Sequence, residues 1–136
     1  MTEAGSGTLS AAAMGCIEAQ RTLSELALAQ GKAGSVRLVE ALSSAELWAR
    51  MAVSHERCVL ADVRRLAGVL MMRGEYERTY GMPELGASCD AEALTLLAIA
   101  ADDGDEEAAR LLLAAAEEMP SGGVVLAQQM RSGEPA

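Results

Sequence analysis

Aromatic residues are almost absent from this chain, which has no Phe, one Trp and two Tyr among its 136 residues. Aromatic and β-branched residues favour strands, and no stretch alternates apolar and polar residues for long. The chain is nevertheless 51% hydrophobic, so its core must consist largely of Ala, Leu, Val and Met. Of these, Ala, Leu and Met are strong helix formers. The sequence therefore predicts an all-α protein, built from antiparallel helical hairpins or as an irregular helical bundle.

Long apolar runs and a cleavable signal are also absent. No run approaches the ~18 apolar residues that cross a bilayer, and residues 1–7 lack the basic segment and apolar stretch of a secretory signal. The three cysteines, Cys16, Cys58 and Cys89, are far apart and form no Cys-x-x-Cys pair. This pattern fits a reducing compartment better than a disulfide framework. We expect free thiols and a cytoplasmic protein that does not enter a membrane.

Positive charge is scarce, because 11 Lys and Arg face 20 Asp and Glu, for a formal net charge of -9. Sequence-independent nucleic-acid binding draws its affinity from Lys and Arg that neutralise phosphates. Direct contact with nucleic acid is therefore not expected, and neither is binding to an anionic membrane. An acidic chain can bind a basic protein surface, or its charge can simply keep it in solution.

Recognisable catalytic and metal-binding motifs are missing as well. His55 and Cys58 have a spacing that can present two metal ligands, and Cys16 and Cys89 could complete a zinc site. Nothing in the sequence brings these cysteines together, and a buried thiol is the simpler interpretation. No orienting group or oxyanion motif accompanies His55 and Cys58. We expect no catalytic residue, no metal and no cofactor.

The expected domain is a single helical one over residues 8–131, between a disordered N-terminus at 1–7 and a disordered tail at 132–136. Its first helix runs from the N-cap Thr8 to Gln30, where Gly31 ends it. A short helix follows Ser35, and Ser43 with Glu46 reads as a capping box that starts another. Residues 45–73 form either one long helix or a hairpin that turns near residues 54–57.

The segment 74–89 contains Gly74, Gly81, Pro83 and Gly86 and is predicted to be a loop. Asp90 is expected to cap a helix that ends near Ala101. Gly104 and Asp105 form a tight turn, 106–119 forms the antiparallel partner, and a last short helix covers 124–130. The acidic run 102–107 lacks the ordered ligands of a calcium loop, so Asp105 is interpreted as an N-cap followed by first-turn glutamates.

Small residues and leucines recur at regular spacing near the end of the chain: Gly86, Asp90, Ala93, Leu96, Ala100, Ala101, Gly104, Ala108 and Leu112. This spacing resembles the Sel1-like repeat, a relative of the tetratricopeptide repeat. One good repeat covers about 86–113 and a degenerate one lies upstream, so the resemblance covers roughly half the chain. Leu96 stands where the family has an aromatic residue, and Leu113 where it has Gly. The resemblance implies paired antiparallel helices, the first capped by Asp90. Repeat arrays usually need three or more units, so the N-terminal helix must act as a cap or the protein must dimerise.

Two groups of residues are candidates for partner binding. Both tyrosines lie in the predicted loop, so Tyr76, Tyr80, Met82 and Leu85 form the first group, and Tyr is enriched at interface hot spots. The alternative is that such a loop folds these side chains onto the body of the protein.

The second group consists of Arg50, Arg57 and Arg64, which recur every seven residues and form a row if their helix is continuous. The alternative is a solvated face, with Glu46 pairing to Arg50.

The leading hypothesis is a non-enzymatic adaptor or inhibitor that binds a protein partner through its helical hairpins and the 74–89 loop. A self-associating helical bundle, such as a homodimer, is the second hypothesis. The third is an acidic inhibitor, for example phage-encoded, that imitates nucleic-acid charge and blocks a basic protein surface. It would use the carboxylates of Asp102, Asp103, Asp105, Glu106, Glu107, Glu117 and Glu118.

Overall fold

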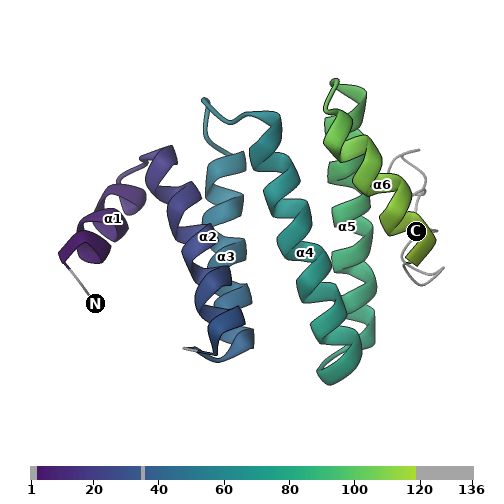
Figure 1. Ribbon diagram of the computed structural model, residues 1–136, viewed down its shortest axis with the longest axis horizontal. Coiled ribbons are helices and arrows are strands. Elements are labelled where there is room, and N and C mark those ends of the chain that lie inside the picture. Colours follow the sequence, from purple (N-terminus) through teal and green to yellow (C-terminus); the bar gives the residue numbers. More distant parts are fainter. Residues whose placement is uncertain (1–2, 35, 119–136) are drawn as a thin grey trace. The chain divides into compact units, whose positions relative to one another are not determined.

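The computed structural model describes residues 3–34 and 36–118, and the regular secondary structure in these ranges is helical. The helices there are α1 Glu3–Ala13, α2 Ile17–Ala33, α3 Leu38–Val53, α4 Leu60–Tyr80, α5 Pro83–Asp102 and α6 Glu106–Glu118 (Figure 1). These ranges contain no strand, so the predicted all-α class is confirmed. None of the helices in them is long and apolar enough to cross a bilayer. The predicted helix 124–130 and tail 132–136 lie outside the described residues.

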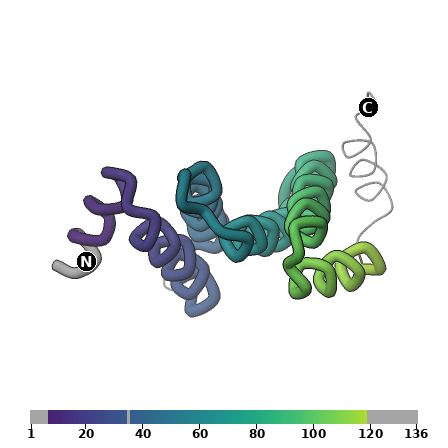
Figure 2. Tube along the Cα trace, turned by 90° about the horizontal axis from the view of Figure 1, so that it is seen from above, coloured from purple at the N-terminus to yellow at the C-terminus, as the bar shows by residue number. Residues whose placement is uncertain are grey.

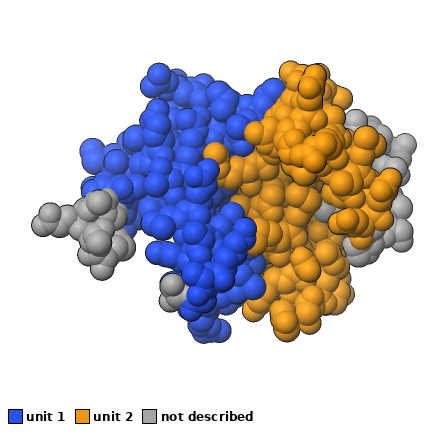
Figure 3. Space-filling model, in the orientation of Figure 1, with its two compact units in different colours: residues 1–62 blue, residues 63–136 orange. Residues whose placement is uncertain are grey.

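The chain divides into two compact units, Met1–Asp62 and Val63–Ala136 (Figure 3). The single helical domain over 8–131 stays a prediction from the sequence. The boundary falls in the first turn of α4, and the surrounding residues 59–65 contain no Gly or Pro that would mark it. Composition therefore gives no signal for it.

In the first unit, α1 packs on α2, and α2 and α3 form an antiparallel hairpin (Figure 2). Its core is largely alanine, as the lack of aromatics requires. A Cβ on Gly31 of α2 would lie 2.6 Å from the Cβ of Ala41 in α3, so the two helices approach closely. The hydroxyl of Ser24 donates to the carbonyl of Ala45 at 2.8 Å across this contact.

Helix boundaries in the first unit differ from the sequence prediction in several places. The expected helix from Thr8 to Gln30 is broken at Gly15, whose φ of 99° favours glycine. Upstream, α1 already includes residues 3–7, which were predicted to be disordered, because the buried Ala12 packs α1 onto its neighbour. Gly31 does not end α2, because its lack of a side chain serves helix packing. Gly34, with a φ of 77°, is the C-cap instead.

Helix α3 differs from the sequence prediction at its start, and its end decides whether residues 45–73 form one helix or two. It runs continuously through Ser43, so the predicted capping box is wrong, and Glu46 pairs with Arg50 at 2.8 Å. The helix then ends at Val53 with Ser54 as C-cap. Since α4 begins only at Leu60, residues 45–73 form two helices, as the hairpin alternative proposed.

In the second unit, α4 and α5 are joined at residues 81–82, and α6 packs back on α5. The predicted loop 74–89 is therefore wrong, since 74–80 belong to α4 and 83–89 to α5. The predicted turn before α6 is confirmed. Gly104 has a φ of 103°, and Asp105 accepts a hydrogen bond from the Ala108 N–H at 3.2 Å as the N-cap. A core cluster of the second unit consists of Ala91, Leu94 and Ala115, with Met71 and Leu112 packed against it.

Candidate functional site

The two tyrosines occupy the last two turns of α4. Because they are four residues apart, Tyr76 and Tyr80 lie on one face of the helix. Their ring centroids are 5.4 Å apart with an interplanar angle of 48°, within the range of favourable aromatic pairs. Tyr76 is half-buried, whereas Tyr80 is 76% exposed. The pair thus presents one ring to solvent and supports it with the other.

A tightly bonded corner follows Tyr80 and leads into α5. The Gly81 N–H donates to the carbonyl of Glu77 at 3.0 Å, and the Met82 N–H donates to the Glu77 carboxylate, also at 3.0 Å. A Cβ on Gly81 would collide with that carboxylate. Pro83 is the first residue of α5, where its missing N–H leaves no hydrogen bond unmade and its fixed φ suits the helix. These contacts hold the corner in one conformation.

Apolar side chains gather at this corner and remain exposed. Met82 is 61% exposed and Leu85 is 36% exposed, within the five residues that follow Tyr80 in the chain. We call Tyr76, Tyr80, Met82 and Leu85 the α4–α5 tip. These four residues are the first candidate group from the sequence, and the connection between their two helices brings them to one end of the second unit (Figure 1). Three of the four are exposed rather than folded onto the protein.

Helices α4 and α5 approach closely beyond the tip. A Cβ on Gly86 would lie 2.9 Å from the carbonyl oxygen of Gly74, and a Cβ on Gly74 would collide with the Asp90 carboxylate. Arg78 of α4 pairs with the buried Asp90 of α5 beside this contact. The expectation that Asp90 caps a helix is therefore wrong. It lies in the interior of α5, where close packing against Gly74 buries its carboxylate and Arg78 partly neutralises it.

The arginine row is not formed. Arg50 belongs to α3, Arg57 to the connection after it and Arg64 to α4, so the continuous helix that the row requires does not exist. Arg50 pairs with Glu46 of its own helix. Arg64 donates to both carboxylate oxygens of Asp105, at 2.8 and 2.9 Å. Arg50 and Arg64 therefore serve separate local contacts.

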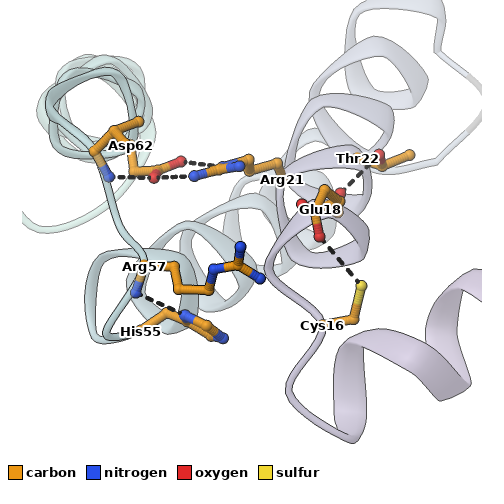
Figure 4. Close-up of polar contacts among 8 residues, drawn as sticks. Cys16, Glu18, Arg21, Thr22, His55, Arg57 and Asp62 are labelled. Atoms are coloured by element: carbon orange, nitrogen blue, oxygen red, sulfur yellow. Dashed lines mark hydrogen bonds and ion pairs between the residues drawn. The ribbon is translucent and has the colours of Figure 1, made fainter.

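A polar cluster in the first unit ties the start of α4 to α2 (Figure 4). Arg21 donates to both carboxylate oxygens of the buried Asp62, at 2.7 and 2.8 Å. Asp62 also accepts a hydrogen bond from the Val59 N–H at 2.8 Å. Val59 is the N-cap position of α4 and Asp62 is the third residue of the helix, so this is the contact by which a side chain in the first turn bonds back to the N-cap. The Asp62 carboxylate raises the pKa of the Arg21 guanidinium. Sequence reasoning missed this pair, although an acidic residue three positions after Val59 was a usable signal.

Cys16 and Glu18 lie near this cluster at the start of α2. The Cys16 thiol donates to the Glu18 carboxylate at 3.7 Å. The pKa of Glu18 is lowered from its ordinary 4.5, first by a hydrogen bond from its own backbone N–H, then by the Cys16 thiol. The positive charges of Arg57 and Arg21 lower the same pKa further. The exposed Cys16 is thus part of a hydrogen-bonded surface group.

Both ring nitrogens of His55 are engaged in hydrogen bonds. Its Nε2 lies 2.9 Å from the carbonyl oxygen of Gly15, and its Nδ1 accepts the Arg57 N–H at 3.0 Å. Since a carbonyl only accepts, this arrangement fits the tautomer with its proton on Nε2. His55 thus braces the turn after α1 against the turn after α3. Within 3–34 and 36–118, no group of three or more His, Cys, Asp or Glu is arranged to hold a metal ion.

The three cysteines that were considered with His55 as zinc ligands form no disulfide. Cys16 is exposed, Cys58 is half-buried and Cys89 is buried in the second unit.

Comparison of the chain with protein-family models, with curated proteins and with solved structures finds no match.

Proposed function

We propose that this chain is a non-enzymatic protein-binding module that recognises a protein partner through the α4–α5 tip. The exposure of Tyr80, Met82 and Leu85 on one bonded corner carries this proposal. Monomeric proteins rarely expose grouped large apolar residues without a binding role. Tyr contributes large contact area at low entropic cost, because it has few rotatable bonds. A rigid corner would lose little conformational freedom on binding.

Other features support a helical scaffold for this tip. The α5–α6 hairpin contains Ala100, Ala101 and the turn residue Gly104 of the Sel1-like spacing, and we propose a repeat-like module on that ground. The interior position of Asp90 departs from the family's capping pattern. Free thiols at all three cysteines fit action in a reducing compartment such as the cytoplasm.

The test is affinity capture with variants of the tip. The tagged chain is used to capture its partner from a lysate of its source cells, and the partner is identified by mass spectrometry. Its Kd is then measured with the purified proteins. We expect Tyr80→Ala with Met82→Ala to weaken the complex by ~2 kcal/mol or more, about 30-fold in Kd. Both side chains are exposed, so helical content should not change.

A matched control replaces an equally accessible methionine of the first unit. Met14 is 86% exposed in the turn after α1, and Met14→Ala should leave the Kd within twofold. Equal binding by the folded tip variant and the parent chain would refute the role of the tip.

Self-association is the second candidate, and a specific observation favours it. Leu113 on α6 is 71% exposed, so the second unit exposes a large apolar side chain outside the tip that a second copy could cover. The acidic-inhibitor alternative is weaker, because Asp105 pairs with Arg64 and Glu107 accepts from Arg110 at 3.1 Å. These two carboxylates would offer less negative charge to a basic surface.

A further inference from the structure

A pocket of about 270 Å³ opens within the second unit, and none of the four tip residues lines it. It is lined by Met71, Glu75 and Arg78 of α4, Asp90 of α5, and Ala115 and Glu118 of α6. Its wall is polar on the side of the carboxylates and apolar at Met71 and Ala115. The Arg78–Asp90 ion pair accounts for two of these four charged groups, and Glu75 and Glu118 line the same hollow.

Asp90 is the buried group of this pocket. The residue is 1% exposed, and its Oδ2 pairs with Arg78. Its Oδ1 is buried and has no hydrogen-bond partner within the part of the chain that the structure describes. An ionised carboxylate accepts several hydrogen bonds, and buried polar atoms in proteins are nearly always partnered. The unpaired oxygen therefore indicates a donor that residues 3–34 and 36–118 do not supply.

The surrounding backbone is built to accommodate this carboxylate. A Cβ on Gly74 would collide with Oδ1 and lie 3.2 Å from the Asp90 Cγ. Any other residue at this position would displace the carboxylate or separate the helices. Close approach at Gly74 and Gly86 thus places a buried negative group at the wall of an open pocket.

The charge of the pocket selects the class of ligand. Glu75, Asp90 and Glu118 bring three carboxylates, and Arg78 brings one positive charge. An anion would be repelled. A metal ion does not fit either, because the described residues contain no ligand group arranged for one. A nitrogen cation can donate to several carboxylates at once, and its alkyl stem can pack on Met71 and Ala115.

We propose that this pocket, the Asp90 pocket, binds a cationic nitrogen group, an alkylguanidinium or alkylammonium. The ligand shares the Asp90 carboxylate with Arg78 and is held at the rim by Glu75 and Glu118. This site is separate from the tip, and its existence does not depend on partner binding there. The cation belongs either to an arginine side chain of another protein or to a free polyamine. Both present a positively charged nitrogen group that donates hydrogen bonds.

The experiment is a titration of the ¹⁵N-labelled chain followed by amide chemical shifts. The probes are Nα-acetyl-arginine amide, putrescine and the uncharged isostere Nα-acetyl-citrulline amide. We expect saturable shifts at Gly74, Arg78 and Asp90 with at least one cationic probe and none with the citrulline compound. Tighter binding of the arginine amide identifies a protein side chain as the source, whereas tighter binding of putrescine identifies a polyamine.

Rim variants separate a built site from general attraction to an acidic protein. Glu75→Gln with Glu118→Gln changes two exposed residues and should preserve the fold. It should weaken binding at least tenfold. The matched control, Glu84→Gln with Glu106→Gln, removes two exposed carboxylates of the same unit that do not line the pocket, and should change the affinity less than twofold. Shifts that do not saturate, that spread over all acidic residues, or that respond equally to both double variants would overturn the proposal.

Discussion

Asp62 and Asp90 are each 1% exposed, but their hydrogen bonding differs. Asp62 accepts two hydrogen bonds from Arg21 and one from the Val59 N–H. Asp90 has an oxygen that no described residue partners. A buried carboxylate with all its hydrogen bonds made fixes local structure, whereas one with a missing donor indicates a binding role. The two residues therefore receive different interpretations, the first structural and the second functional.

Removal of the first carboxylate should destabilise the first unit. Asp62→Ala leaves Arg21 and the Val59 N–H without their acceptor, and we expect a loss of ~2–3 kcal/mol. Trp48 is the only tryptophan of the chain and lies in α3, so its fluorescence during urea unfolding reports on this unit. Glu40→Ala breaks only an exposed pair with Arg37 at 3.9 Å and should cost under ~0.5 kcal/mol. Equal effects of the two substitutions would contradict the assignment.

Glu18 should show the pH dependence of a stabilised carboxylate. Its pKa is lowered in the folded chain, so its contribution to stability is present above the unfolded value of about 4.5 and is lost as pH falls through the folded pKa. NMR titration of the side chain should give a value below 4.5. Arg57→Ala should raise this pKa, and Arg37→Ala should not. A Glu18 pKa that stays the same in the Arg57 variant would remove the proposed charge effect.

At the scale of helices, glycines account for several of the differences between the sequence prediction and the structure. The turn at Gly104 and the N-cap at Asp105 depend only on neighbouring residues, so the sequence could predict them. Gly74 and Gly86 were interpreted as helix breakers, yet they lie within helices because α4 and α5 approach there. A single sequence does not reveal which helices will touch, so this use of glycine could not be predicted.

The candidate site shows the same division between local and tertiary information. The composition of residues 74–89 led to the choice of the four residues of the tip, because aromatic residues are so rare in this chain, and their role in binding stays a prediction. Their placement on two helices and a short corner was missed. The Asp90 pocket was missed altogether, although Asp90 has the spacing of the apolar Leu94 and Leu97 on one helix face. An acidic residue on an apolar stripe was the available signal.

Two glycines of α4 should respond to the same substitution with opposite sign. A Cβ on Gly68 meets no atom within 4 Å, so Gly68→Ala should stabilise the protein by ~0.5–1 kcal/mol through helix propensity. A Cβ on Gly74 would collide with the Asp90 carboxylate and lie 3.2 Å from the Gly86 carbonyl oxygen. Gly74→Ala should therefore destabilise by ~1–3 kcal/mol. Urea unfolding followed by ellipticity at 222 nm measures both, and a stabilising effect at Gly74 would disprove the close helix contact.

At the scale of the whole molecule, net charge and exposed apolar residues have opposite effects on association between copies of the chain. The formal net charge of -9 disfavours association between copies. Exposed apolar residues such as Tyr80 and Leu113 favour it. Charge repulsion is strongest at low salt, because the screening length falls from ~30 Å at 0.01 M to ~4–5 Å at 0.5 M. Salt concentration therefore distinguishes a partner-binding module from a self-associating bundle.

We expect the 136-residue chain to sediment as a monomer of 14.1 kDa at both low and high salt. The tip has too few apolar residues for a stable dimer interface of the usual ~1,200–2,000 Å². Sedimentation equilibrium across a hundredfold range of protein concentration measures the mass directly. A mass that doubles at high salt and returns to the monomer value in Leu113→Glu would contradict the prediction. If Tyr80→Ala left that doubling intact, α6 rather than the α4–α5 tip would carry the interface, and self-association would replace partner binding as the function.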